Sequence, residues 1–323
     1  MQEKCDWAVL EMTSEGAKQF RHLFIDLDAL IFTNISPEHI ESHGSFEKYL
    51  EAKLSLARAL EASPKMSKVI VANIDDKDGE KFLAVDVPNK FPYKLDDAKL
   101  FSLTQNGLDM MFEGEKISSP LQGIFNVENI LAAATFAKSQ GISAETIKKA
   151  VEKVTEIKGR VQKIDEGQNF AVVVDYAHTP NSLRALYEAF PGQKKICVLG
   201  GTGGGRDKWK RPEMGKIAEE YCDEIILTNE DPYDESPKAI IEEIAAGIKI
   251  KKPKIILDRR QAISEGVTLA SLVQTDNGNS SAVLITGKGT DPYIMEANGK
   301  KTPWSDERVA REELRNIKNR HLT

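Results

Sequence analysis

Four loops in this 323-residue sequence carry side chains of the types that bind phosphates, carboxylates and sugar hydroxyls. The most informative is GGTGGGRDKWKRP, residues 200–212, where five glycines precede a cluster of cations. The cations are Arg206, Lys208, Lys210 and Arg211. Glycine lets the backbone approach a ligand closely, and the cations can donate charge-assisted hydrogen bonds to a carboxylate or phosphate. A flexible surface loop is the alternative. The loop is not a Walker A motif, because no GxxxxGK[ST] occurs in the 323 residues.

The other three loops also follow apolar segments. Asp175, in VVVDYAHTP, can bind a ribose hydroxyl or can equally serve as the N-cap of the next helix. The segment 229–237 holds four acids in a turn that contains two prolines, a run that is more common in solvated loops. The segment 287–293 begins with GKG and leaves Asp291 at the end of a predicted strand. These residue types fit the binding of a polar, charged ligand.

Three residues in the first half are informative only in combination. Glu11 at the end of an apolar run is more often a surface residue, and a lone histidine such as His39 is more often structural. Lys53 lies within a predicted helix. Together with TNISPEHIESHG, residues 33–44, they form a pattern that has a functional interpretation.

The elements that must position the loops are clearest after residue 157, where apolar strands alternate with amphipathic helices. We expect strands over 170–176, 194–200, 223–228, 254–257 and 281–286, and helices over 181–190, 212–221, 237–248 and 259–271. This alternation is typical of a parallel sheet with helices on both faces. Ligands bind outside the carboxyl ends of such strands, so the loops should line one crevice.

The first half mixes both kinds of element. We expect strands over 7–12, 28–34, 68–74 and 80–87, and helices over 46–62, 127–141 and 143–154. The segment 88–120, rich in Asp, Lys, Pro and Gly, predicts irregular structure or edge hairpins. The two patterns place a domain boundary near residue 157.

Composition excludes several classes of protein. Lys and Arg number 44 against 50 Asp and Glu, and the net charge of −6 argues against a nucleic-acid scaffold. The three cysteines include no CxxC pair, so we expect neither a disulfide framework nor a thiolate zinc site. No run of about 18 apolar residues occurs, and the first residues do not read as a signal peptide. These features predict a cytoplasmic protein without membrane or nucleic-acid partners.

Nine segments carry a family resemblance. They are LEMTSEGAKQFR (10–21), FTNISPEHIESHG (32–44), EAKLSLA (51–57), GIFNVENILAA (123–133), GRVQKI (159–164), VVVDYAHTPNSL (172–183), GGGRDKWKRPEMG (203–215), EDPYDESP (230–237) and GKG (287–289). In this order they closely resemble the Mur ligases, the ATP-dependent amide-forming enzymes of peptidoglycan synthesis. Within that family the resemblance is to the MurE-type UDP-N-acetylmuramoyl-tripeptide synthetases.

The resemblance implies a reaction and its small-molecule partners. Members transfer the γ-phosphoryl group of ATP, with Mg²⁺, to a substrate carboxylate, here that of a UDP-MurNAc-dipeptide. The amine of an incoming amino acid then attacks the acyl phosphate and forms the amide. Positioning and charge neutralisation carry most of such a reaction.

The resemblance also implies site residues, which it places as follows. Metal ligands are Glu11, His39 and Lys53, the lysine as a carbamate, and the catalytic residues are Lys53, His39 and Arg206. Nucleotide contacts are Asn126, Asn129, Arg160, Asp175 and His178. Substrate contacts are Thr13, Gln19, Arg21, Arg206, Glu230, Asp231, Tyr233, Gly287 and Asp291. We expect Glu11, His39 and Lys53 to lie together in the structure.

Two departures from the family pattern matter. Diaminopimelate-adding members carry Asp-Asn-Pro-Arg and Gly-Lys-Gly-His-Glu, where this chain has Glu230–Tyr233 and 287–291. We therefore expect a cationic acceptor such as lysine or ornithine. Members also begin with a uridine-nucleotide domain and a P-loop, and this sequence starts beyond both.

The sequence therefore predicts an α/β protein with an incomplete central Mur-ligase ATPase domain over 1–156 and a C-terminal Rossmann-like parallel-sheet domain, the amino-acid-binding domain, over 157–323. We expect the chain to be inactive alone. A related folylpolyglutamate or cyanophycin-type ligase is one alternative, although TNISPEHIESHG and DYAHTP favour the muramyl branch. A non-catalytic nucleotide-binding or regulatory module is the other.

Overall fold

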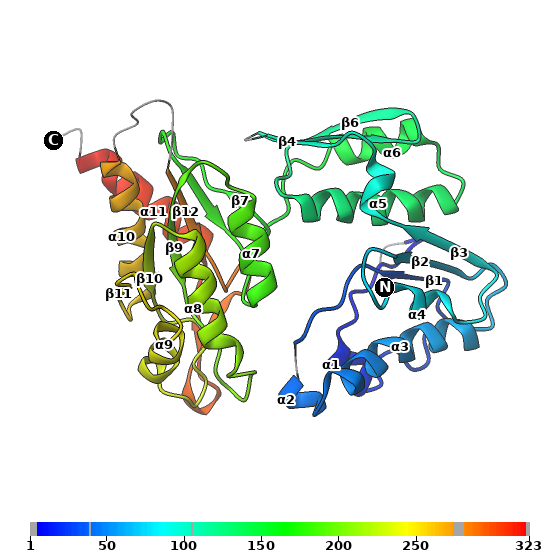
Figure 1. Ribbon diagram of the computed structural model, residues 1–323, viewed down its shortest axis with the longest axis horizontal. Helices are drawn as coiled ribbons and strands as arrows, with labels where there is room; N and C mark the ends of the chain where they lie inside the picture. The colour runs from blue at the N-terminus through cyan, green and yellow to red at the C-terminus, as the bar shows by residue number, and fades with distance from the viewer. Residues whose placement is uncertain (1–4, 39, 105, 274–280, 321–323) are drawn as a thin grey trace. The chain divides into compact units, whose positions relative to one another are not determined.

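The computed structural model describes residues 5–38, 40–104, 106–273 and 281–320. The chain divides by its internal contacts into two compact units (Figure 1). The smaller unit holds Met1–Lys99 and Glu128–Ile147, and the larger unit holds Leu100–Val127 and Lys148–Thr323. The domain boundary at residue 156 stays a prediction, because a division by packing alone does not define a domain.

The larger unit is built on a six-stranded sheet with the order β11-β10-β9-β12-β8-β7. Its strands are β7 (Gln162–Lys163), β8 (Ala171–Val174), β9 (Lys194–Leu199), β10 (Glu224–Leu227), β11 (Lys254–Ile255) and β12 (Ser281–Ile285). Strands β8 to β12 are parallel, and β7 pairs antiparallel with β8. The predicted α/β class with a parallel sheet is confirmed.

Helices connect these strands and cover both faces of the sheet (Figure 1). They are α7 (Pro180–Glu188), α8 (Lys210–Tyr221), α9 (Pro237–Ala245), α10 (Arg259–Leu272) and α11 (Asp306–Arg320). The side chains of Thr179, Ser236 and Asp258 accept a hydrogen bond from the N3 amide of α7, α9 and α10. Each satisfies an amide that the helix itself leaves unpaired. Thr179, and not Asp175, is therefore the N-cap of α7.

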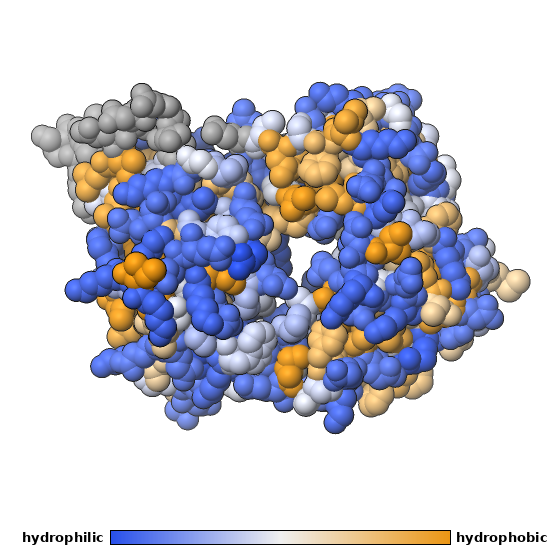
Figure 2. Space-filling model, in the orientation of Figure 1, coloured by the Kyte–Doolittle hydropathy of each residue, from blue (hydrophilic) through white to orange (hydrophobic). Residues whose placement is uncertain are grey.

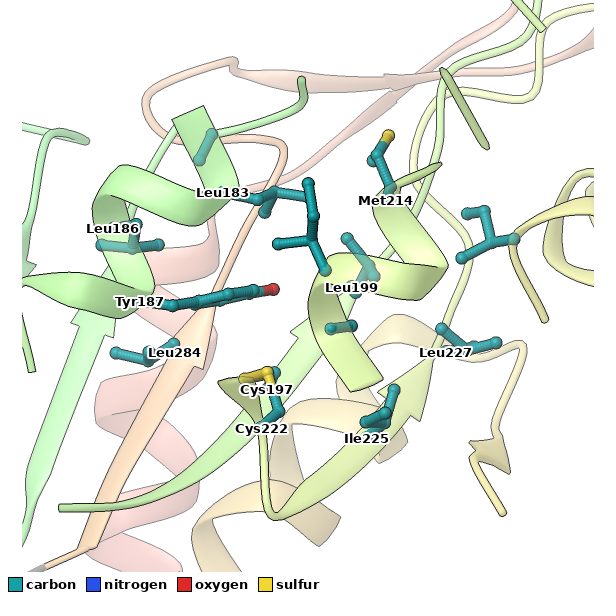
Figure 3. Close-up of a cluster of buried hydrophobic side chains, with 14 of the residues drawn as sticks. Leu183, Leu186, Tyr187, Cys197, Leu199, Met214, Cys222, Ile225, Leu227 and Leu284 are labelled. Atoms are coloured by element: carbon teal, nitrogen blue, oxygen red, sulfur yellow. A yellow bond between two sulfur atoms is a disulfide. The ribbon is translucent and has the colours of Figure 1, made fainter. Parts of the chain in front are cut away.

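The sheet is buried on both faces, as its continuous apolar strands require. One cluster packs Leu183 and Tyr187 of α7 against Leu199 and Leu284 on one face (Figure 3). The cluster on the other face includes residues of α10 and α11. All five residues of β12 are buried, so this central strand is shielded from solvent on both sides.

A disulfide joins Cys197 and Cys222, which contradicts the expectation drawn from the cysteine count (Figure 3). Cys197 lies in β9, and Cys222 lies between α8 and β10, the strand beside β9. The two are 25 residues apart in sequence, but the fold brings their Cα atoms to 6.0 Å, a normal disulfide separation. Cysteine spacing alone could not show this, and the cysteine argument for a reducing compartment no longer holds.

The larger unit also contains two small antiparallel sheets. One comprises β4 (Ser102–Thr104), β5 (Gly107–Phe112) and β6 (Glu115–Ser119), and the other comprises β13 (Tyr293–Met295) and β14 (Lys301–Pro303). Positive φ at Glu113 and Gly114 closes the two-residue turn from β5 to β6. The expectation of edge hairpins within 88–120 is confirmed for β4, β5 and β6. Two helices, α5 (Ile124–Ser139) and α6 (Ala144–Glu152), follow these strands in the chain.

The smaller unit is built on a three-stranded parallel sheet, in the order β1-β2-β3. Its elements are α1 (Ser14–Lys18), β1 (Ala29–Phe32), α2 (Ile40–His43), α3 (Phe46–Ala62), β2 (Val69–Asn73), α4 (Gly79–Leu83), β3 (Asn89–Tyr93) and the 3₁₀ turn η1 (Leu95–Ala98). The central strand β2 is buried at every position, and the predicted helix 46–62 has the expected bounds.

Two predicted strands of this unit are wrong. Residues 7–12 form no regular element, and Trp7, Val9 and Leu10 are exposed, so this apolar run does not pack as a strand. Within 80–87 the chain forms helix α4, whose Phe82 stacks on Phe32 of β1 with ring centroids 3.9 Å apart. A short apolar run such as 80–87 suits both a strand and a helix. Packing of this segment against the sheet selects the helix.

The surface of the molecule is mostly polar. Hydrophobic patches interrupt it in several places over residues 1–152, on the right of the view in Figure 2. Exposed apolar side chains of the smaller unit include Trp7, Phe20, Phe24 and Ile31. None of the helices in the described ranges is long and apolar enough to cross a membrane.

Candidate active site

The loop that follows β8 holds the predicted nucleotide-binding residues. Asp175 is buried, and its carboxylate accepts hydrogen bonds of 2.7 Å from the amides of Val161 and Ala177. Burial raises the pKa of Asp175, although the two amides and the charges of Arg160 and His178 oppose the shift. The carboxylate thus ties the segment at 159–161 to the loop that leads into α7. Its binding of a ribose hydroxyl stays a prediction.

An aromatic side chain that sequence reasoning missed, Tyr176, contacts two of the predicted nucleotide-binding residues. The guanidinium of Arg160 lies over the ring of Tyr176, 4.4 Å from its centroid. The ring of His178 meets the ring of Tyr176 edge-on at 4.7 Å, and its Nδ1 lies 2.7 Å from the carbonyl oxygen of Tyr176. Tyr176 therefore orients both predicted nucleotide contacts through its ring and backbone. Its place in DYAHTP was the only signal available.

The two predicted asparagines lie near the start of α5. Asn126 is buried and donates a 2.7 Å hydrogen bond to the carbonyl oxygen of Gln122, so its amide braces the first turn. Asn129 is exposed one turn later. The structure brings Asp175, Arg160 and His178 together in the larger unit, which also holds Asn126, whereas Asn129 falls in the smaller unit.

The glycine-rich loop packs closely on the acidic loop after β10. The amide of Gly203 donates a 2.8 Å hydrogen bond to the carbonyl oxygen of Asp231. A Cβ at Gly203 would lie 2.1 Å from the carbonyl oxygen of Pro232, so only glycine permits this approach. Arg206 is exposed in this loop, so its guanidinium is accessible to a ligand.

Arg211 does not serve as the ligand donor that the sequence suggested. Its guanidinium is buried and donates to the carboxylates of Glu235 and Glu243 and to the carbonyl oxygen of Thr202. Lys208 also lies 3.2 Å from the Glu235 carboxylate. The expectation that all four cations face a ligand is therefore wrong for Arg211, which stabilises the loop instead. A buried arginine with three acceptors is a structural brace.

The acidic loop and the GKG loop meet in a buried charge cluster. The ammonium of Lys288, which is 1% exposed, donates to the Asp231 carboxylate at 2.7 Å and lies 3.4 Å from the Asp291 carboxylate. The second oxygen of Asp231 accepts a 2.8 Å hydrogen bond from the amide of Met295. Asp231 is thus paired within this chain, and Lys288 is a charged neighbour of the predicted substrate contacts that sequence reasoning missed.

Glu230 presents the opposite situation. Its Oε1 accepts a 2.7 Å hydrogen bond from the Thr202 hydroxyl, but its buried Oε2 has no hydrogen-bond partner within the described ranges. Gly287 lies directly beside that oxygen, and a Cβ there would be 2.1 Å away. Gly287 also has φ +105°, which a side chain rarely adopts. Tyr233, three residues after Glu230 in the acidic loop, is half-buried and has φ +50°.

A cavity of about 150 Å³ opens next to this cluster. Its lining residues are Gln162, Gly289, Thr290, Asp291, Ser305 and Glu307. Two of the six are carboxylates, and the other side chains are neutral, so the cavity suits a cationic group.

The predicted metal residues belong to the smaller unit. The amine of Lys53 in α3 lies 3.4 Å from the carbonyl oxygen of Met12. Burial lowers the pKa of Lys53, and the carboxylates of Glu38 and Glu11 act in the opposite direction. Glu38 is a further residue that sequence reasoning missed. His39 lies outside the described residues, so the predicted grouping of all three ligands stays a prediction.

These residues fit a hard divalent cation in their chemistry. Carboxylate oxygens are the ligands that Mg²⁺ prefers, and a carbamate on Lys53 would add two more oxygens. The lowered pKa favours the neutral amine, the form that reacts with CO₂. Among the residues that the structure describes, no three His, Cys, Asp or Glu side chains form a metal-binding group. The fit therefore depends on the modified lysine.

The predicted dipeptide contacts surround α1. The hydroxyl of Thr13 accepts a 3.0 Å hydrogen bond from the amide of Gly16 and so caps the helix. Gln19 is the C-cap of α1, and both Gln19 and Arg21 are exposed. His43 of α2 lies 3.1 Å from the Ser14 hydroxyl and so links α2 to α1.

Comparison with known proteins agrees with this architecture. Residues 1–137 match the Mur ligase middle domain, and residues 159–289 match the glutamate ligase domain of the Mur ligases. The chain belongs to the Mur ligase family. Its middle and C-terminal domains are those of a MurE-type member, as the relatives described next indicate.

Two relatives carry the same name, UDP-N-acetylmuramoyl-L-alanyl-D-glutamate–2,6-diaminopimelate ligase. The protein from Syntrophomonas wolfei is 34% identical over 97% of this chain and 65% of its own length. The protein from Aquifex aeolicus is 35% identical over 95% of this chain and 62% of its own length. This chain thus spans a little under two thirds of these relatives.

Solved structures support the same fold. A UDP-N-acetylmuramoyl-L-alanyl-D-glutamate–2,6-diaminopimelate ligase aligns with a TM-score of 0.57 and 28% identity, over 95% of this chain and 64% of that one. The folylpolyglutamate synthase of Mycobacterium tuberculosis aligns with a TM-score of 0.62 over 82% of this chain and 62% of that one, at 19% identity. The second likeness shows a shared fold alone.

Proposed function

We propose that this chain supplies the middle and amino-acid-binding domains of an ATP-dependent ligase that adds an amino acid to a UDP-MurNAc-dipeptide. The observation that carries the proposal is the arrangement at the carboxyl ends of β8, β9, β10 and β12, where four loops present a cation–aromatic pair, a glycine-rich turn and an acidic cluster. Ligands of parallel sheets bind at this edge. The named relatives support the same reaction.

In this proposal each residue has one task. Arg160, held over Tyr176, neutralises phosphate charge, and His178 and Asp175 contact the rest of the nucleotide, ATP. Arg206 holds the α-carboxylate of the incoming amino acid with its guanidinium. Thr13, Gln19, Arg21 and the asparagines contribute further substrate contacts.

Glu11, Lys53 as a carbamate and His39 would hold Mg²⁺, which supplies charge neutralisation at the phosphates when bound. The chain prepares this site by burying the Lys53 amine, which lowers its pKa and so favours the neutral form that can be modified. Glu38 adds negative charge beside it.

We infer that the acceptor is a cationic amino acid such as lysine or ornithine. The cavity is lined by the carboxylates of Asp291 and Glu307, and the neighbouring acidic loop adds Glu230, whose buried Oε2 has no hydrogen-bond partner within the described ranges. Diaminopimelate carries a distal carboxylate as well as an amine, and Tyr233 can offer that carboxylate only one neutral hydroxyl. Because Lys288 neutralises Asp231, the acidic character rests on Glu230, Asp291 and Glu307.

The proposal is tested by phosphate release. The 323-residue chain should show no substrate-dependent ATP hydrolysis, because its sequence contains no Walker A motif to bind the β- and γ-phosphates. Fusion to the part of the Syntrophomonas wolfei relative that precedes the matched region should produce hydrolysis that requires both UDP-MurNAc-dipeptide and amino acid. A fusion that binds nucleotide without any turnover would support the non-catalytic module instead.

A further inference from the structure

One buried arginine outside the predicted site connects its two acidic loops. Arg259 is the first residue of α10, and its side chain is 1% exposed. It forms a two-pronged pair with Asp306 at the start of α11, in which Nε donates at 2.8 Å and Nη2 at 2.7 Å. Asp306 is fully buried. Such a fork-to-carboxylate pair fixes the plane of the guanidinium.

The remaining donors of Arg259 reach two backbone carbonyls. Nη1 donates to the carbonyl oxygen of Asn229 at 3.2 Å, and Nη2 donates to the carbonyl oxygen of Thr286 at 2.7 Å. Asn229 directly precedes Glu230, and Thr286 directly precedes Gly287. One guanidinium therefore binds the carbonyl oxygens of the two residues that directly precede Glu230 and Gly287.

Trp304 completes the arrangement. Its indole N–H donates a 2.7 Å hydrogen bond to Oδ1 of Asp306, the same oxygen that accepts from Nε of Arg259. The Asp306 carboxylate is thus held from two directions, and the guanidinium has one orientation. Burial lowers the pKa of Arg259, but the carboxylates of Asp306, Glu230 and Asp231 raise it above its ordinary value.

The spacing between the two loops matters because their side chains meet in a small volume. The unpartnered Oε2 of Glu230 lies against Gly287 with no room for a Cβ, and Lys288 bridges Asp231 and Asp291. A displacement of either loop by a fraction of an ångström would change which carboxylates face the cavity. Because these side chains are proposed to bind the acceptor amino acid, a displacement of this size should weaken its binding.

We propose that Arg259 is a positioning residue that sets the separation of the Glu230 and Gly287 loops and thereby the affinity for the incoming amino acid. This inference rests on the proposed function. Arg259 does not touch the substrate. It positions the loops through its hydrogen bonds to the two carbonyl oxygens. Asp306 and Trp304 in turn orient the guanidinium of Arg259.

The chain provides a matched control in the next residue. Arg260 lies on the same helix and also pairs with α11, through Glu312 and Glu313, with 2.9 Å to Glu313 Oε1. Its bonds link the two helices at the surface without reaching the loops. Arg259→Lys keeps the charge but loses the fork, whereas Arg260→Lys makes the equivalent change at the surface.

The experiment measures two quantities. Steady-state kinetics for the acceptor are measured on the fusion described above, and amide hydrogen exchange is measured on the 323-residue chain. Arg259→Lys should raise the KM for the acceptor amino acid about tenfold or more while kcat and the KM for ATP change less than threefold. Exchange should accelerate at 229–233 and 286–291. Trp304→Phe, a milder change that retains the ring, should raise the same KM about threefold.

Equal kinetics and equal exchange for Arg259→Lys and Arg260→Lys would overturn the proposal. Faster exchange throughout the larger unit, without a selective change in acceptor KM, would also overturn it by showing a general loss of stability. If the unsubstituted fusion shows no acceptor-dependent turnover, the proposed function fails, and the exchange at the two loops then tests the positioning role separately. If Arg259→Lys does not fold, Trp304→Phe decides, since an unchanged acceptor KM there contradicts the proposal.

Discussion

The two units hold their site residues in different ways. In the larger unit the site loops are tied by buried charges, with Arg211, Arg259 and Lys288 each 1% exposed in their side chains. In the smaller unit Glu11 and Arg21 are exposed. Buried hydrogen-bonded charges fix a single geometry, whereas exposed side chains lose little by moving. We infer that the proposed acceptor site is preorganised, and we expect the exposed predicted site residues of the smaller unit to become ordered when their ligands bind.

The hydrophobic cores of the two units also differ, in the amount of apolar surface that they bury. The larger unit buries both faces of a six-stranded sheet, with two apolar clusters. The smaller unit has a three-stranded sheet with an apolar cluster on it, and side chains such as Trp7 and Phe24 are exposed. Because stability grows with apolar area removed from water, we expect the smaller unit to unfold first.

The largest effect is expected at the predicted metal site of the smaller unit. Lys53→Met should lower ATP turnover of the fusion by about 10²- to 10³-fold, the usual cost of removing one group that stabilises transition-state charge. Lysine binding by the larger unit should be unchanged. Lys53→Arg is the control that keeps a cation without a carbamate, and it should be equally inactive.

The same residue gives a pH dependence. Only the neutral amine forms a carbamate, and its fraction rises with pH through the pKa. Because burial lowers the pKa of Lys53, the carbamate should form at a lower pH than on an exposed lysine. A ¹³C carbamate signal from ¹³C-bicarbonate, present in the unsubstituted chain and absent from Lys53→Arg, checks this. A signal that persists in Lys53→Arg would assign it to another amine.

The difference between the cores can be measured with paired substitutions. Ile70 in β2 and Leu284 in β12 are each fully buried, and truncation to alanine should cost about 2–5 kcal/mol at either site. Trp7 reports on the smaller unit, and Trp209 and Trp304 report on the larger one. Ile70→Ala should shift only the urea transition reported by Trp7. Leu284→Ala should shift only the transition reported by Trp209 and Trp304. Coincident shifts would show one cooperative unit in place of two.

The sequence predicted the larger unit better than the smaller one, for a physical reason. Continuous apolar strands separated by capped helices specify a parallel sheet almost uniquely, and Asp175, Glu230 and Asp291 follow from the ends of its strands. In the smaller unit the runs 7–12 and 80–87 suit a strand, a helix or a loop, and only packing against the sheet decides between them.

The remaining errors in site prediction have one cause. Lys288 meets Asp231, Tyr176 meets Arg160, and Arg259 meets Asn229, Thr286 and Asp306, all distant in sequence, and no spacing rule reveals such contacts. Cys197 and Cys222 meet for the same reason. Residue type and motif identify groups that touch a ligand, but the residues that hold those groups become visible only in the fold.

The disulfide gives an effect confined to the larger unit. It closes a 25-residue separation, and its loss in a Cys197→Ala, Cys222→Ala variant should cost roughly 3 kcal/mol by loop-closure entropy. The Trp209 and Trp304 transition should move to lower urea, and the Trp7 transition should stay in place. A reductant should reproduce the shift in the unsubstituted chain and have no effect on the variant. Two free thiols at these positions in the purified protein would contradict the disulfide.

The smallest expected effect concerns the choice of acceptor at the preorganised site. Tyr233→Arg should raise kcat/KM for diaminopimelate relative to lysine by roughly tenfold, because a guanidinium can hold the distal carboxylate with two charge-assisted hydrogen bonds. Tyr233→Phe removes only the hydroxyl and is the matched control, which should leave the ratio within threefold. Amino-acid-dependent phosphate release by the fusion measures both. Since the relatives are diaminopimelate ligases, a preference for diaminopimelate in the unsubstituted protein would reject the cationic acceptor. The acidic cavity would then have to hold the distal amine while another cation, with Arg206 already on the α-carboxylate, takes the distal carboxylate.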